Sequence, residues 1–221
     1  MMKYIIKIVA DQYDSLIIRC YVRIRFIIIN INLLEMIVNY IPRNGKLVTL
    51  GCGFGLFECA IALLNPALEI YGYDLNEERI RQAKKVSKKL NLNNVNFFCL
   101  DVTDEDIFQN CNCILILDLL HHISFSDQEK VLNRCYEMLS HDGVIIIKDI
   151  HCRNKLKLYF TWLLDIIMTK NGPVYYFDQQ LMRSRMQSMH LHTIEMPIND
   201  WLPYPHILYL GFKFLNTNSQ V

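Results

Sequence analysis

The feature that most constrains this 221-residue chain is a short apolar run that ends in three alternating glycines. Residues 46–50 lead directly into Gly51-Cys52-Gly53-Phe54-Gly55, and residues 56–64 then follow a helical pattern. Glycines between a strand and a helix let the backbone turn sharply and approach a ligand closely. The pattern therefore predicts a strand, a ligand-binding loop and a helix; the alternative is a turn that binds no ligand.

The spacing of these glycines narrows the class of ligand. A dinucleotide-binding loop would need a third glycine where Leu56 stands, and a P-loop would need a Gly-Lys-Ser/Thr sequence that is missing here. The spacing therefore favours an uncharged or zwitterionic ligand over a pyrophosphate.

Two aspartates follow the next two apolar runs of the chain. Asp74 ends the run 70–73, where a carboxylate can accept both hydroxyls of a ribose. Its alternative role, capping the following helix, is already filled by Asn76. Asp101 ends the run 95–100 and could accept from an exocyclic amine while the Val102 amide meets a ring nitrogen. Taken alone, Asp101 would be read as a turn aspartate beside Thr103.

The order of the patterned segments predicts the fold class. Apolar runs alternate with helical patterns through residues 46–147, which predicts an α/β fold with a mostly parallel sheet covered on both faces. We expect strands at 46–50, 70–73, 95–100, 113–117 and 144–147, and helices at 56–64, 76–90, 155–168 and 179–189. A further helix should start at the capping-box spacing of Ser126 and Glu129, and Gly143 should end its connection to the next strand. Residues 191–196 and 206–214 should form a late antiparallel pair.

Composition sets limits on the environment and the partners. Hydrophobic residues make up 52% of the chain and its net charge is +1, so disorder is excluded and a nucleic-acid partner is disfavoured. The eight cysteines mostly sit in apolar runs, and the pair Cys111 and Cys113 has no second pair to complete a metal site. We expect reduced thiols, no metal and a cytoplasmic location without a signal peptide. Residues 24–41 predict a buried or amphipathic helix, with peripheral membrane contact as the alternative.

The motifs together resemble the class I S-adenosylmethionine-dependent methyltransferases. The resemblance covers about residues 46–150 and rests on five segments in order: Leu50–Gly55, Gly72-Tyr73-Asp74, Leu100-Asp101-Val102, Leu117-Asp118-Leu119-Leu120-His121-His122 and Leu139-Ser140-His141-Asp142-Gly143-Val144. It implies a Rossmann-like, seven-stranded, mostly parallel sheet with helices on both faces and a C-terminal antiparallel hairpin. It also implies S-adenosyl-L-methionine as the cofactor. The cofactor contacts implied are Gly51, Cys52, Gly53, Gly55, Asp74, Leu75, Asp101, Val102 and Asp118.

One position departs from the family pattern. The family usually has an acidic residue two positions before the first glycine, and this chain has Thr49 there. A hydroxyl keeps some hydrogen bonding to the loop but loses the charge that faces the ammonium group of the cofactor. Thr49 therefore puts the affinity for the cofactor in question.

The resemblance implies a methyltransferase that acts on a small, apolar or aromatic acceptor at oxygen or carbon. Because the cofactor supplies the leaving group, the protein mainly orients and desolvates the reactants, and a hydroxyl acceptor would also need a base. Our first choice for this base is His122, with Asp149 second and His121 third; local packing is the alternative for either histidine. A nucleic-acid methyltransferase is disfavoured, because Asp118-Leu119-Leu120-His121 lacks the Asn/Asp-Pro-Pro-Tyr/Phe run that stacks a flipped base. A non-catalytic binding or regulatory relative, supported only by Thr49, remains the alternative function.

The two ends of the chain are less informative. We expect residues 1–45 to form a helical segment or lid on a methyltransferase domain at 46–221, and the oligomeric state stays open. Trp201, Tyr204 and His206 could line an acceptor site, although a turn that packs into the core explains the same aromatic residues.

Overall fold

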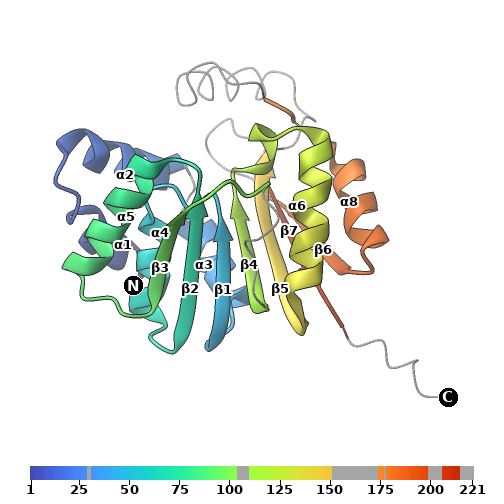
Figure 1. The fold of residues 1–221 in the computed structure, drawn as a ribbon, viewed down its shortest axis with the longest axis horizontal. Coiled ribbons are helices and arrows are strands. Elements are labelled where there is room, and N and C mark those ends of the chain that lie inside the picture. The colour runs from blue at the N-terminus through green and yellow to red at the C-terminus, as the bar shows by residue number, and fades with distance from the viewer. Residues whose placement is uncertain (29–30, 104–109, 151–173, 177, 199–205, 215–221) are drawn as a thin grey trace. The chain divides into compact units, whose positions relative to one another are not determined.

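The computed structural model describes residues 1–28, 31–103, 110–150, 174–176, 178–198 and 206–214. The chain divides into two compact halves, Met1–Ile107 and Phe108–Val221, and each is described by itself. Figure 1 traces the elements in both.

A three-stranded parallel sheet forms the centre of the first half. Its strands are β1 (Gly45–Leu50), β2 (Leu68–Asp74) and β3 (Val95–Cys99), with β2 between the other two. Leu47 pairs with Ile70, and Ile70 pairs with Val95. All three strands were predicted from their apolar runs, and a parallel arrangement carries their carboxyl ends to one edge.

Two helices connect these strands, and both follow the predicted pattern. Helix α4 (Leu56–Leu64) begins at the last loop glycine, and α5 (Glu77–Lys89) follows β2. The Asn76 side chain accepts a hydrogen bond from the Arg79 amide at 3.0 Å, so Asn76 is the predicted N-cap. Ile80, Ala83 and Val86 are buried along one face of α5. Because Asn76 caps α5, Asp74 is not needed as the cap and is available for the site.

Three helices precede β1: α1 (Met2–Ala10), α2 (Leu16–Ile28) and α3 (Ile31–Tyr40). The described part of the predicted helix 24–41 is helical, from Ile24 to Ile28 in α2 and from Ile31 to Tyr40 in α3. Each has its own buried face, with Val22 inward on α2 and Leu34 and Ile37 inward on α3.

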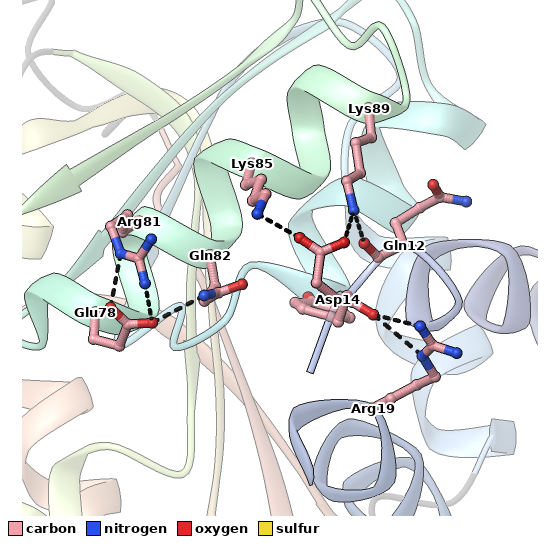
Figure 2. A network of polar contacts seen from close by, with 9 residues as sticks. Gln12, Asp14, Arg19, Glu78, Arg81, Gln82, Lys85 and Lys89 are labelled. Atoms are coloured by element: carbon pink, nitrogen blue, oxygen red, sulfur yellow. Dashed lines mark hydrogen bonds and ion pairs between the residues drawn. The ribbon is translucent and has the colours of Figure 1, made fainter. Parts of the chain in front are cut away.

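The link between α1 and α2 is fixed to α5 by charge. Figure 2 shows the Asp14 carboxylate between Lys85 and Lys89, and Lys89 also donates to the Gln12 carbonyl at 2.7 Å. The hydrogen bonds from Lys85 and Lys89 lower the pKa of Asp14 to about 2. Arg19 completes the link by donating to the Tyr13 carbonyl at 2.7 Å. The N-terminal segment is thereby tied to the helix that follows β2.

The second half contains a four-stranded mixed sheet. Its order is β4 (Cys111–Leu117), β5 (Leu139–Ile150), β7 (His206–Phe212) and β6 (His192–Pro197). Strand β4 runs parallel to β5, whereas β7 is antiparallel to both β5 and β6. The predicted antiparallel pair of late strands is confirmed.

Helices α6 (Phe125–Met138) and α8 (Gln179–Ser188) accompany this sheet, and a single 3-10 turn η1 (Leu120–His122) follows β4. The predicted start of α6 was two residues late. Ser124, rather than Ser126, is the N-cap, because its hydroxyl accepts from the Asp127 amide at 3.2 Å. Asp127 therefore takes the capping-box position that the sequence assigned to Glu129.

Strand β5 is longer than predicted. It begins at Leu139, and its pairing with β4 jumps from Cys111↔Leu139 to Cys113↔Val144. Gly143 thus lies within a bulged strand instead of ending a connection, and a Cβ at this position would come within 2.5 Å of Leu139 Cγ.

The seven strands and their directions confirm the predicted Rossmann-like α/β class. Among the described helices, none is long and apolar enough to cross a membrane. The predicted helix 155–168 and the residues Trp201 and Tyr204 lie outside the described residues, whereas His206 begins β7 and is buried.

Candidate active site

The glycine loop wraps around the end of β2. The amides of Gly51 and Cys52 both donate to the Tyr73 carbonyl, at 2.8 and 2.9 Å. Gly53 and Gly55 adopt left-handed backbone angles, with φ of 56° and 71°. A Cβ on Gly55 would clash with Phe97, whereas a Cβ on Gly53 would meet nothing within 4 Å. The space beside Gly53 is therefore open to a ligand.

Asp74 is held directly against this loop. Its Oδ2 accepts from the Gly53 amide at 2.8 Å and its Oδ1 from the Asn76 amide at 2.9 Å, and the residue is 7% exposed. A carboxylate has about four acceptor positions, so two fixed hydrogen bonds orient it and leave further lone pairs for ligand hydroxyls. The structure thus joins two of the predicted site elements.

The Asp101 region lies at the same edge. The Leu100 amide donates to the Asp74 carbonyl at 3.0 Å, which brings the end of β3 beside the end of β2. Asp101 Oδ1 accepts from both the amide and the hydroxyl of Thr103, at 2.9 and 2.8 Å, so Asp101 organises a turn. Val102 is buried and Leu75 is 70% exposed. A turn role does not prevent Asp101 from accepting a ligand amine through its other oxygen.

A second buried carboxylate, which the sequence reasoning missed, lies beside the loop. Glu58 in the first turn of α4 is 3% exposed and lies beside Thr49, whose hydroxyl donates to the Tyr71 carbonyl at 3.5 Å. Burial raises the pKa of Glu58 to about 7, with the Asp74 charge adding to the rise. The available signal was a lone acidic residue in a helix that is otherwise apolar.

Tyr13 closes the other side of the loop. This fully buried phenol donates to the Phe54 carbonyl at 2.8 Å, and its ring meets the Phe54 ring edge-on. Tyr21 also contacts Phe54 edge-on, and Arg79 lies over its face. The N-terminal segment therefore holds the loop in place. No sequence motif predicted this contact.

In the second half, His121 and Asp149 form a buried pair. His121 Nδ1 hydrogen-bonds Asp149 Oδ1, and both residues are at most 1% exposed. Asp149 Oδ2 also accepts from the Leu120 amide at 3.0 Å, and Oδ1 accepts from the Ile150 amide at 2.7 Å. Asp149 is thus placed to orient His121, because its oxygens already hold three donors.

His122 is the more exposed of the two histidines. It is half-buried, and its ring centroid lies 3.9 Å from that of His121. Tyr176 stacks on His121 at 5.8 Å, and the Tyr175 amide donates to the His121 carbonyl at 2.7 Å. Tyr176 thus places an aromatic ring against this histidine pair, whereas the Tyr175 ring meets Phe125 edge-on.

Asp118 follows β4 with a left-handed φ of 52°. It is paired with Lys148, whose side chain is fully buried within β5, and its amide donates to the Lys148 carbonyl at 2.9 Å. A buried lysine in an apolar strand requires such a partner. Sequence reasoning missed Lys148, although a charge inside the run 144–150 was a visible signal.

No group of three or more His, Cys, Asp or Glu residues that could hold a metal ion occurs in the described part of the chain. Seven cysteines are described, and all are free thiols.

Comparison with known proteins agrees with the fold and the site described above. A family model described as "Methyltransferase domain" matches residues 42–200. The chain belongs to this family, and its resemblance to the class I S-adenosylmethionine-dependent methyltransferases is confirmed.

Individual relatives are distant. A carboxy-S-adenosyl-L-methionine synthase of Nautilia profundicola is 24% identical over 64% of this chain and 58% of its own length. An O-methyltransferase family protein from Burkholderia thailandensis has a TM-score of 0.67 and 16% identity over 83% of this chain and 55% of its own. Magnesium protoporphyrin IX methyltransferase from Synechocystis, solved with bound S-adenosylhomocysteine, has a TM-score of 0.65 and 16% identity over 82% of each chain. The chain thus spans little more than half of that curated synthase.

Proposed function

We propose that this protein transfers a methyl group from S-adenosyl-L-methionine to a small apolar or aromatic acceptor, at oxygen or carbon. The observation that carries the proposal is the left-handed glycine loop held on Asp74, with open space beside Gly53. Family membership supports it. Nothing in the structure favours a non-catalytic relative.

The residues of the first half suit the parts of this cofactor. The loop Gly51–Gly55 offers backbone groups to the amino-acid part, Asp74 offers carboxylate oxygens to the ribose, and Asp101 with Val102 would meet the adenine. When bound, the cofactor supplies an electrophilic methyl group on a sulfonium. The protein's own task is to orient the reactants and exclude water.

The residues of the second half suit the acceptor. We infer that His122 accepts the acceptor's proton where a base is needed, while Asp149 holds His121 and thereby the neighbouring ring. The Tyr176 ring, stacked on His121, suits an acceptor with an apolar or aromatic body. Free thiols suit a reducing, cytoplasmic location.

The proposal is tested by calorimetry with S-adenosylhomocysteine. Asp74→Ala should weaken binding about 100-fold or more, because hydrogen bonds to a charged group contribute about 1.5–3 kcal/mol each. Asp142→Ala, at an exposed carboxylate of β5, is the matched control and should bind like the wild type. Equal affinity of Asp74→Ala and wild type would sink the cofactor assignment.

An acceptor screen then tests the reaction. Products should be followed by mass spectrometry, because one relative is named as a synthase of a modified S-adenosylmethionine. A methylated acceptor supports the proposal; a modified cofactor without one would replace it.

A further inference from the structure

Glu58 is a buried carboxylate without a full set of partners. It is 3% exposed, and its Oε2 has no hydrogen-bond partner among the described residues. The other residues of α4 are apolar. Leaving a carboxylate buried and half-unsatisfied is costly, so a residue of this kind points to a missing cationic or donor group.

The position of Glu58 identifies where that group would lie. The residue follows Gly55 by one helical turn and lies beside Thr49 of β1. It is also close enough to Cys52 and Asp74 to interact with both electrostatically. The carboxylate therefore lies at the loop that offers its backbone to the amino-acid part of the cofactor.

Thr49 and Glu58 together explain the departure from the family pattern. The family places an acidic residue at the position of Thr49, where its charge faces the cofactor's ammonium group. We propose that in this protein Glu58 supplies that charge from α4, beside the uncharged Thr49. This inference rests on the proposed cofactor and assigns a binding residue that the motif does not contain.

The charges around Glu58 make this contact sensitive to pH. Burial and the Asp74 charge together raise the pKa of Glu58 to about 7, and Arg25 of α2 opposes this rise. The nearby thiols and phenol all have raised pKa values and stay neutral at pH 7 (Tyr13, Cys52 and Cys59). An ammonium group favours the ionised carboxylate. The affinity for a ligand with an ammonium group should therefore increase as pH rises through about 7. Below that pH, binding should release the proton of Glu58.

The experiment compares two ligands that differ only at the amino-acid end. S-Adenosylhomocysteine carries the ammonium group, whereas 5′-methylthioadenosine keeps the adenine, ribose and thioether but lacks the amino acid. Calorimetry at about pH 8 should show that Glu58→Gln weakens S-adenosylhomocysteine on the order of 30-fold, the lower end for breaking a buried charge pair. The affinity for 5′-methylthioadenosine should stay within about twofold, because that ligand brings no charge to the site.

Two further variants sharpen the result. Returning the charge to the family position, in Thr49→Asp combined with Glu58→Gln, should restore most of the lost affinity. Glu77→Gln, at an exposed acidic residue in the first turn of α5, is the control and should change neither ligand. The rise of wild-type affinity with pH should be absent in Glu58→Gln.

The possible failures are distinguishable. If the wild type binds S-adenosylhomocysteine and Glu58→Gln binds it equally well, the inference is wrong and the proposed function stands. Equal losses for both ligands would also overturn it, because they would show a structural role for Glu58. If the wild type binds neither ligand, the proposed function fails and the inference with it.

Discussion

The raised pKa of Glu58 also predicts how the stability of the folded protein depends on pH. The pKa moves from 4.5 to about 7 on folding, because the carboxylate is buried. The difference is about 2.5 units, and at about 1.4 kcal/mol per unit the ionised carboxylate destabilises the fold by about 3 kcal/mol. The folded state holds this proton more tightly than the unfolded state. The stability is therefore fully present below about pH 4.5 and is lost as pH rises through about 7.

Replacing Glu58 with Gln removes this titration while keeping the shape of the side chain. The free energy of unfolding of Glu58→Gln relative to wild type should increase by roughly 2–3 kcal/mol between about pH 5 and pH 8. Urea unfolding followed by far-UV circular dichroism measures both proteins without ligand at each pH. Carboxyl groups with lowered pKa values, such as Asp14 and Glu195, titrate below this window and cancel in the difference. Parallel pH profiles for the two proteins would refute the reasoning.

Two further predictions concern the loop and the histidine pair. Tyr13→Phe removes the hydrogen bond to the Phe54 carbonyl and should lower the free energy of unfolding by about 1 kcal/mol. Hydrogen exchange of the loop amides should also become faster. Unchanged exchange would contradict the role of Tyr13 in holding the glycine loop. Asp149→Asn should lower kcat at least about tenfold, because His121 loses the carboxylate that orients it and no longer fixes the neighbouring His122 ring. His122→Ala should lower kcat with little loss of stability, since His122 is half-buried; a stable, fully active variant would remove His122 from the mechanism.

The sequence predicted the elements whose signal is local. The apolar run of β1, the 3.6-residue period of α5 and its Asn76 cap each depend on neighbouring residues, and the structure has them within a residue or two. The glycine loop and Asp74 were predicted because the carboxyl ends of parallel strands must share an edge. Their direct contact through the Gly53 amide adds a detail that no spacing specifies.

The failures concern information that is not local. His121 and His122 are equivalent in the sequence, and only the packing of β5 gives Asp149 to His121. The sequence reasoning missed Glu58 because its spatial neighbour Thr49 is nine residues away on another element.

The relation between Thr49 and Glu58 shows why a binding motif is better defined in space than along the chain. Strand β1 and helix α4 flank the glycine loop, so an acidic side chain on either element can reach the same side of it. Moving the charge from the strand to the helix still provides the negative charge that an ammonium ligand requires, while Thr49 on the strand carries none. The carboxylate then lies in the first turn of a helix, where the backbone dipole favours its ionised form. The charge is therefore carried by α4 instead of β1, and the ammonium group of the ligand still faces a carboxylate.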